Sequence, residues 1–230
     1  MIEKWKKEYF DEEFYECKTG NTEGGDGVKG GQRSKLSENE MLRRKDVANV
    51  IRRFFPKCKT WHQAGAGCGY IAHFLNEMKG VKKITASDIS DYATKKDADG
   101  NYVNAVFPVR QCDIRELNKV VRKNSCDIVF CWNIIEYLPT LDEFRKGLKS
   151  MMNVSKDWVM LGLSTKECLE LRPAGITGRN LIYPREFWEE EFRKTKGFEY
   201  QEDMTREFCE AFDPGNWRSS GGFILRKKVQ

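Results

Sequence analysis

The stretch of sequence that decides the fold reads Trp61-His62-Gln63-Ala64-Gly65-Ala66-Gly67-Cys68-Gly69-Tyr70-Ile71-Ala72-His73-Phe74-Leu75. Three glycines at alternate positions separate a short strand-like run from a run with helical apolar spacing. Glycine has no Cβ, so the chain can turn tightly from strand into helix, and a ligand can come close to the backbone. The pattern predicts a strand over residues 59–63, a ligand-binding turn, and a helix over residues 71–79.

An acidic residue, Asp88, follows the next strand-like run, residues 81–87. An open α/β sheet places a carboxylate at this position against the two ribose hydroxyls of a bound nucleoside. A dinucleotide fingerprint would have its third glycine at position 70. This chain has Tyr70 there, and its third glycine is Gly69. The spacing therefore indicates a Rossmann-like unit whose nucleoside ligand is not a dinucleotide.

Strand-like and helical segments alternate along the rest of the chain, which predicts a doubly wound, mostly parallel α/β sheet with helices on both faces. The further strands expected are residues 106–112, 127–132 and 158–163, and the further helices are residues 37–55, 115–123, 141–152 and 184–195. Two last strands, residues 198–202 and 222–228, follow with no helix expected between them. Without a crossover connection they should form an antiparallel hairpin.

The front of the chain is expected to be separate from this unit. Residues 1–16 mix charges with aromatic residues at helical spacing and predict a short amphipathic helix. Residues 19–31 contain six glycines in thirteen positions and cannot hold a regular element. A capping box from Ser37 to Glu40 begins the next helix, whose expected apolar face includes Met41 and Leu42. We therefore expect an N-terminal helix and linker over residues 1–36, acting as a lid, and a single domain over residues 37–230.

The net charge of the chain is small. Forty basic residues against 35 acidic residues give a formal charge of +5, with a sequence pI of about 8.7. A nucleic-acid-binding domain usually has a pI above about 9, with its basic residues clustered on one face. The basic residues here are spread along the chain, so a nucleic-acid partner is possible but not favoured.

The eight cysteines form no Cys-x-x-Cys pair, and the only histidines are His62 and His73. A zinc site is therefore not expected. We predict buried free thiols, as suit a reducing cytosol, and structural roles for both histidines. The sequence has no secretory signal and no apolar run near the roughly 18 residues of a membrane span. These observations predict a soluble, cytoplasmic protein with no membrane partner.

The glycine turn and Asp88 resemble motif I and the following acidic motif of the class I S-adenosylmethionine-dependent methyltransferases. Five strand–helix units closed by an antiparallel hairpin resemble the fold of this family over residues 37–230. A looser resemblance, carried by the aromatic N-terminal segment, the glycine turn and the run Asp88-Ile89-Ser90-Asp91-Tyr92-Ala93, is to small methyltransferases of glycan and polysaccharide biosynthesis. The resemblance implies a methyltransferase that uses S-adenosylmethionine as its methyl donor.

The resemblance also implies a donor site at the carboxyl ends of the strands. Its expected contacts are Gln63, Gly65, Ala66, Gly67, Gly69, Asp88, Ile89, Asp113, Ile114, Cys131 and Trp132. Asp88 would bind the ribose, Ile89 would stack on the adenine, and Asp113 would receive the adenine amino group. Gln63 departs from the family, which usually has an acid near the amino group of the donor, and this change is expected to weaken donor binding.

Glu136 and Tyr137, just past the fourth strand, are the first candidates for a catalytic base or an acceptor contact. A sugar hydroxyl ionises far above neutral pH, so a group that takes its proton is expected at the carboxyl ends of the strands. Tyr137 stands where a histidine is common in the family, so the role of that histidine does not carry over. Further acceptor contacts are expected from residues 164–184 and 203–218, with the candidates Arg172, Arg179, Tyr183, Arg185 and Trp217.

Two acceptor classes are disfavoured by absent motifs. Methylation of an exocyclic base amine typically needs a D/N-P-P-Y/F turn after the fourth strand, and this chain has Trp132-Asn133-Ile134-Ile135. Methylation of cytosine C5 needs a nucleophilic cysteine, usually in a Pro-Cys pair that is absent here. We predict methyl transfer to a hydroxyl or carboxylate of a small-molecule or glycan acceptor. RNA or protein methylation, and a non-catalytic donor-binding protein, are the alternatives.

Overall fold

The structure, a computed structural model, describes residues 38–167, 179–212 and 221–228. The expected helix over residues 1–16, the glycine-rich segment 19–31 and the capping residue Ser37 lie outside these described residues. The same holds for two of the candidate acceptor contacts, Arg172 and Trp217.

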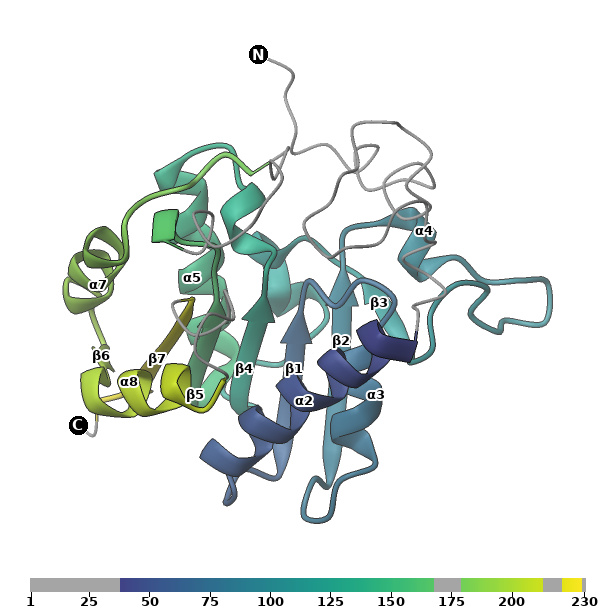
Figure 1. The fold of residues 1–230 in the computed structure, drawn as a ribbon. Helices are drawn as coiled ribbons and strands as arrows, with labels where there is room; N and C mark the ends of the chain where they lie inside the picture. Colours follow the sequence, from purple (N-terminus) through teal and green to yellow (C-terminus); the bar gives the residue numbers. More distant parts are fainter. Residues whose placement is uncertain (1–37, 168–178, 213–220, 229–230) are drawn as a thin grey trace.

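One seven-stranded sheet with the order β3-β2-β1-β4-β5-β7-β6 forms the centre of the molecule (Figure 1). Its strands are β1 (Thr60–Ala64), β2 (Lys83–Asp88), β3 (Val109–Gln111), β4 (Cys126–Trp132), β5 (Ser155–Gly162), β6 (Phe198–Tyr200) and β7 (Gly222–Lys227). The first five strands run parallel, whereas β7 runs antiparallel to both β5 and β6. The predicted mostly parallel sheet with an antiparallel pair at its end is confirmed.

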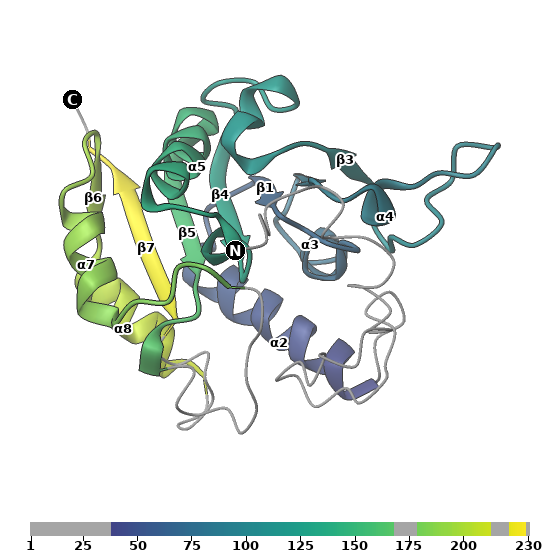
Figure 2. The same ribbon diagram turned by 90° about the horizontal axis from the view of Figure 1, so that it is seen from above.

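Helices cover both faces of the sheet (Figures 1 and 2). The helical elements are α2 (Glu38–Phe54), α3 (Tyr70–Asn76), α4 (Asp91–Thr94), η2 (Ile114–Lys119), η3 (Ile135–Tyr137), α5 (Leu141–Val154), α7 (Arg185–Arg193) and α8 (Glu202–Glu210). Buried side chains of α2, α3 and α8 form one apolar core, and those of η2, α5 and α7 form a second. The sheet separates these two cores, so both of its faces are buried.

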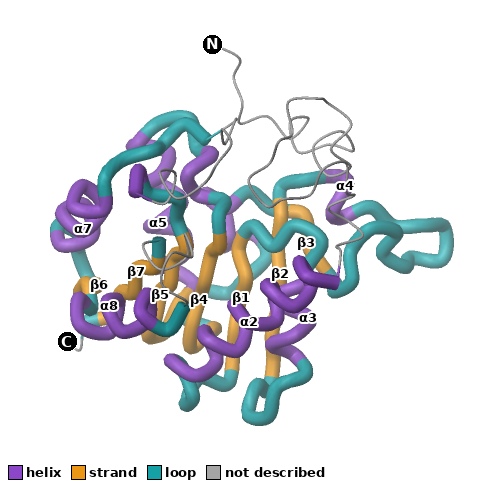
Figure 3. Tube along the Cα trace, viewed as in Figure 1, coloured by secondary structure: helices purple, strands orange, loops and turns teal. Residues whose placement is uncertain are grey.

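Helix α8 corrects one prediction, because it lies between the two antiparallel strands where no helix was expected (Figure 3). Met204, Phe208 and Phe212 recur at a spacing of four, which places them on one side of a helix. Phe208 is fully buried and packs edge-on against Phe54 of α2 at a centroid distance of 5.3 Å. The antiparallel pairing of β6 and β7 holds, and the connection between them is longer than predicted.

Three smaller expectations were also wrong. Met41 and Leu42 are 39% and 53% exposed and do not belong to the buried side of α2. The helix expected over residues 115–123 is a short 3-10 helix, η2, that ends at Lys119. The third strand spans three residues rather than residues 106–112. Each error concerns the end of an element, where tertiary packing overrides the local pattern.

The first strand is unusually polar for a buried parallel strand, and cross-strand hydrogen bonds explain why it is stable. His62 is 1% exposed, with Nδ1 2.9 Å from Thr85 Oγ1 and Nε2 3.1 Å from Ser87 Oγ, both on β2. Burial lowers the pKa of His62 to about 3. The predicted structural role of His62 is confirmed: this side chain replaces an apolar contact by two bonds between neighbouring strands.

The described cysteines agree with the expectation of buried free thiols. Six cysteines are free and buried: Cys58, Cys68, Cys112, Cys126, Cys131 and Cys209. Burial raises the pKa of Cys68 to about 12, and Asp88 acts in the same direction. Since the thiolate is the reactive form, a raised pKa makes a nucleophilic role unfavourable for this residue.

Candidate functional site

The glycine turn connects the carboxyl end of β1 to the start of α3. Gly65, Gly67 and Gly69 all have positive φ angles, of 67°, 53° and 82°. A Cβ on Gly65 would lie 2.6 Å from Cγ2 of Ile134, and one on Gly69 would lie 2.8 Å from Cβ of Phe107. The outer two glycines are therefore required by packing within the protein. At Gly67 the backbone itself makes a polar contact, because its N–H donates to Oδ2 of Asp88 at 2.7 Å.

Asp88 lies at the carboxyl end of β2 and is 4% exposed. Its carboxylate accepts the N–H of Gly67 at 2.7 Å and the N–H of Ser90 at 2.9 Å. Burial raises the pKa of Asp88, while backbone hydrogen bonds from Ser90, Gly67 and Ile89 favour the ionised form. Each carboxylate oxygen can accept about two hydrogen bonds, so this carboxylate can still accept hydrogen bonds from the hydroxyl groups of a ligand.

Five buried polar atoms at the carboxyl ends of the central strands have no hydrogen-bond partner in the part of the chain that the structure describes. Four of them can accept a hydrogen bond, namely Gln63 Oε1, Asn133 Oδ1, Glu136 Oε2 and Ser164 Oγ, and the fifth is the indole donor Trp132 Nε1. They follow or end β1, β4 and β5, which are neighbours in the sheet and finish at the same edge (Figure 1). Buried polar atoms are normally paired. A group of unpaired acceptors at one edge therefore indicates a site that a ligand with hydrogen-bond donors would complete.

Asn133 is the first residue after β4 and has a φ angle of 57°, in the left-handed region. Its N–H donates to the carbonyl of Gly162 at the end of β5, at 2.7 Å. Non-glycine residues in this region are uncommon, although asparagine is enriched among them, and they concentrate at functional sites. Sequence reasoning did not single out Asn133 or Ser164. Their only signal was that Asn133 directly follows β4, and that Ser164 lies two residues after β5, at the start of the range 164–184 expected to supply acceptor contacts.

Glu136 and Tyr137, both in η3, are held by residues 179–181. Glu136 is fully buried, and its Oε1 accepts Nε–H of Arg179 at 3.0 Å. The guanidinium carbon of Arg179 lies 5.3 Å from the centroid of the Tyr137 ring. Tyr137 is 5% exposed and packs in the core. The structure thus brings three sequence candidates together, with one oxygen of Glu136 paired and the other unpaired.

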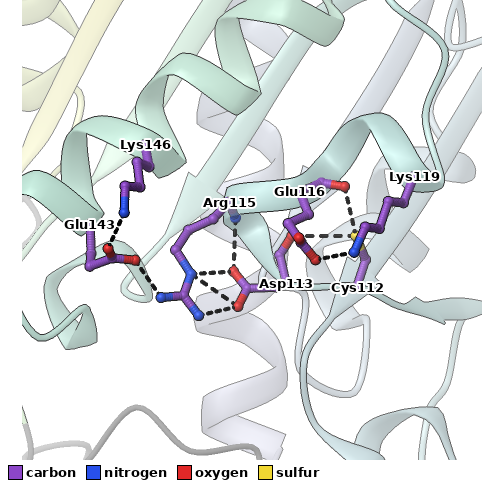
Figure 4. Close-up of polar contacts among 7 residues, drawn as sticks. All are labelled: Cys112, Asp113, Arg115, Glu116, Lys119, Glu143 and Lys146. Atoms are coloured by element: carbon purple, nitrogen blue, oxygen red, sulfur yellow. Dashed lines mark hydrogen bonds and ion pairs between the residues drawn. The ribbon is translucent and has the colours of Figure 1, made fainter.

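Asp113, the expected partner of the adenine amino group, is already paired with Arg115 (Figure 4). Its Oδ1 accepts the backbone N–H of Arg115 at 2.8 Å and Nε–H of Arg115 at 2.9 Å. Its Oδ2 accepts Nε–H and Nη2–H of the same side chain. Arg115 also donates to Glu143 of α5. A bond from Asp113 to adenine would therefore require Arg115 to move, and the role of Asp113 stays a prediction.

Figure 4 also shows that the ion pairs of this network connect η2 to α5. A groove of about 800 Å³ lies along the two helices. Ten residues line it: Asp113, Arg115, Glu116, Asn118, Lys123, Glu143, Lys146, Lys149, Ser150 and Asn153. Most of its charges are paired with one another. We therefore place the candidate site at the unpaired acceptors and not in this groove.

The other expected donor contacts differ in what their side chains can reach. The indole of Trp132 packs against Phe208 and Phe212, and a Cβ on Gly162 would collide with it. Cys131 points into the opposite core. Their side chains are therefore core residues, and only their backbone lies at the end of β4. Ala66 donates its N–H to the carbonyl of Ser87 at 2.9 Å. Ile114 is buried, and Ile89 is half-buried against the core.

Neither a metal site nor a membrane span emerges from the described residues. They contain no group of three or more His, Cys, Asp or Glu side chains that could hold a metal ion. No helix among them is long and apolar enough to cross a membrane.

Residues 62–157 match the family model of a methyltransferase domain. This segment contains the glycine turn, Asp88 and the fourth strand. No curated protein sequence is significantly similar to the chain.

Several solved structures share the fold. The plantazolicin methyltransferase BamL, in complex with a triazolic desmethylPZN analog and SAH, is 12% identical with a TM-score of 0.56, over 83% of this chain and 86% of that one. SAM-bound CalS10 from Micromonospora echinaspora, an amino pentose methyltransferase involved in calicheamicin biosynthesis, is 14% identical with a TM-score of 0.54, over 85% and 93%. The small RNA methyltransferase HEN1 is 14% identical with a TM-score of 0.58, over 89% of this chain and 28% of that one.

Proposed function

We propose that this S-adenosylmethionine-dependent methyltransferase transfers the methyl group to a hydroxyl of a small-molecule or glycan acceptor. The observation that carries this proposal is the pair of buried, unpartnered acceptors past β4, Glu136 Oε2 and Asn133 Oδ1. A hydroxyl brings the hydrogen-bond donor that these atoms lack. A carboxylate acceptor brings none and would be repelled by Glu136, so it fits this place less well.

The residues present also fit the methyl donor. We propose that Asp88 accepts the ribose hydroxyls, since backbone N–H groups of Gly67 and Ser90 hold its carboxylate in place. We propose that Gln63 Oε1, which is buried and unpartnered, accepts a hydrogen bond from the donor's ammonium group. An amide oxygen can accept this bond, though more weakly than a carboxylate. S-adenosylmethionine supplies a methyl group already activated on a sulfonium sulfur.

With an activated donor, the protein must align the acceptor and remove its proton. As the acceptor oxygen bonds to the methyl carbon, the carbon–sulfur bond breaks and the hydroxyl proton must leave. In our proposal Glu136 Oε2 takes that proton. Asn133 Oδ1 and Ser164 Oγ accept hydrogen bonds from neighbouring hydroxyls of a polyol and orient it. Tyr137 packs beside Glu136, and its ring helps to exclude water.

The structurally similar methyltransferases do not identify the methyl acceptor of this chain. Their names refer to plantazolicin, an amino pentose and small RNA, which are three different acceptor classes on one fold. The proposal therefore rests on the unpaired atoms of this chain and not on those likenesses.

A labelled-methyl transfer screen with the full chain tests the proposal. The screen would compare sugars and other alcohols, carboxylic acids, RNA oligonucleotides and peptides. We expect transfer to an alcohol. Transfer to RNA, peptides or carboxylic acids, with none to any alcohol, would overturn the acceptor class.

The role of Glu136 is tested by Glu136→Gln, which keeps the shape of the side chain and removes the base. Turnover should fall by the roughly 10²–10⁴-fold typical of a lost general base. Donor affinity, measured by calorimetry, should stay the same because the proposed donor contacts are untouched. Equal turnover in mutant and wild type would contradict the role of Glu136.

A further inference from the structure

We propose that Arg179 is a positioning residue for methyl transfer, which fixes one oxygen of Glu136 and thereby directs the other toward the acceptor. This inference rests on the proposed role of Glu136 as the base. Arg179 belongs to no motif and lies 43 residues after Glu136 in the chain. It reaches η3 only in the folded protein.

The contact between the two side chains is shielded from water. The Arg179 and Glu136 side chains are 6% and 0% exposed, and Nε lies 3.0 Å from Oε1. Buried charges attract more strongly than surface charges, because little solvent screens them. A carboxylate held in this way has few alternative rotamers, so the direction of Oε2 follows from the position of Arg179.

The backbone around Arg179 is also held against η3. The N–H groups of Asn180 and Leu181 both donate to the carbonyl of Glu136, each at 3.0 Å, and Asn180 Nδ2 donates to the carbonyl of Tyr137 at 2.8 Å. The guanidinium lies over the Tyr137 ring. These contacts hold the backbone next to Arg179 against η3 and thereby restrain Arg179 relative to Glu136.

The pattern of the ion pair argues for positioning rather than for stability alone. A guanidinium can engage both oxygens of a carboxylate through two parallel N–H bonds, and this is the geometry of many Arg–carboxylate pairs. Arg115 engages both oxygens of Asp113 in the same molecule, Oδ1 through Nε and Oδ2 through Nη2. Arg179 engages only Oε1 of Glu136, and Oε2 stays buried without a donor. The pair therefore fixes one carboxylate oxygen of Glu136 and leaves the other able to accept a proton.

The test uses the full chain and the most active alcohol from the transfer screen as the acceptor probe. Arg179→Met removes the charge and the hydrogen bond. We expect kcat to fall by about 10- to 100-fold, as for a misplaced catalytic group, with donor affinity unchanged. Arg179→Lys keeps the charge without the planar guanidinium and should recover part of the loss. Arg145→Met removes a more exposed ion pair, with Glu191 between α5 and α7, and should leave kcat unchanged.

A double-mutant cycle separates positioning from simple anchoring. If Arg179 acts through Glu136, Arg179→Met should cost almost nothing more in the Glu136→Gln background. Amide hydrogen exchange at Asn180 and Leu181 should stay slow in Arg179→Met, since their bonds to the Glu136 carbonyl do not involve the side chain of Arg179. If Arg179→Met does not fold, the same cycle with Arg179→Lys provides the measurement.

Two results would overturn the positioning role: wild-type kcat in Arg179→Met, or losses that add fully in the double mutant. The failure of this inference is distinct from a failure of the proposed function. If Glu136→Gln alone has wild-type turnover, the base assignment fails. If Glu136→Gln is impaired while the Arg179 variants are not, only the positioning role fails.

Discussion

Replacing Gly65 by alanine tests whether the glycine turn and the segment after β4 are packed as one unit. The new Cβ would lie 2.6 Å from Cγ2, 2.7 Å from Cγ1 and 2.8 Å from Cβ of Ile134. These contacts are too short for carbon atoms, so Ile134 or the turn must shift. Ile134 lies between Asn133 and Glu136, and a shift would therefore move the proposed acceptor contacts as well.

The magnitude follows from two separate costs. Gly65 has a φ of +67°, where a residue with a Cβ costs about 1–2 kcal/mol. Overpacking of a well-filled site adds about 1–3 kcal/mol, for a total loss of stability of about 2–5 kcal/mol. Gly100→Ala is a matched control, because Gly100 has a φ of +84° with nothing within 4 Å of the added Cβ. It should show only the backbone cost.

The assay is urea-induced unfolding of both variants and of the wild type, followed by calorimetric titration with the methyl donor. Gly65→Ala should unfold at lower urea than Gly100→Ala and bind the donor more weakly. Ile134→Ala removes Cγ1 and Cγ2, the two closest atoms. It should therefore cost less in the Gly65→Ala background than alone. Equal destabilisation of Gly65→Ala and Gly100→Ala would refute the argument that Ile134 fills the space beside the turn.

Two further predictions concern buried titratable groups next to the turn. Asp88→Asn places an amide NH₂ against the N–H groups of Gly67 and Ser90 and removes a charged acceptor worth roughly 1.5–3 kcal/mol. Donor affinity in calorimetry should fall at least about tenfold, and wild-type affinity would exclude the ribose role. Burial holds the pKa of His62 at about 3 instead of 6.5, so the unfolded chain binds this proton first as the pH falls. Between pH 6 and 4 the free energy of unfolding should therefore drop by up to about 1.4 kcal/mol per pH unit through this residue. In urea unfolding, His62→Gln should remove that part of the pH dependence. The same pH dependence of stability in His62→Gln and wild type would contradict the prediction.

The sequence was most informative about backbone conformation and about the alternation of strands and helices. The glycines at alternate positions all adopt positive φ angles, and Asp88 ends β2 as predicted. Both features are local, because they depend on missing Cβ atoms and on the period of apolar residues. The polar run before the glycines is also a strand. Its stability depends on Thr85 and Ser87, which belong to another strand and could not be paired with His62 from the local pattern.

Side-chain direction was much harder to predict. The family resemblance implied that Trp132 and Asp113 contact the donor. In the structure the indole of Trp132 packs in the core, and the carboxylate of Asp113 is paired with Arg115. Alternate residues of a strand point to opposite faces, so the register of a strand decides whether the side chain of its last residue points into a core or toward the ligand edge. Asn133, one position after Trp132, has a buried Oδ1 without a partner.

The unpaired atoms at the edge of the sheet affect the stability of the whole molecule. A buried polar atom without a partner costs about 1–3 kcal/mol, so the five such atoms at this edge represent a cost comparable to the roughly 5–15 kcal/mol of net stability of a typical domain. The two apolar cores on either side of the sheet must offset this cost in the free enzyme. A ligand that supplies the missing donors recovers part of it on binding. In the proposed function the methyl donor pairs with Gln63 Oε1, and the unpaired oxygens left for the methyl acceptor follow two neighbouring strands, β4 and β5. A methyl acceptor with several hydroxyls pairs with more of these oxygens than a ligand with a single polar group, which supports the proposed polyol.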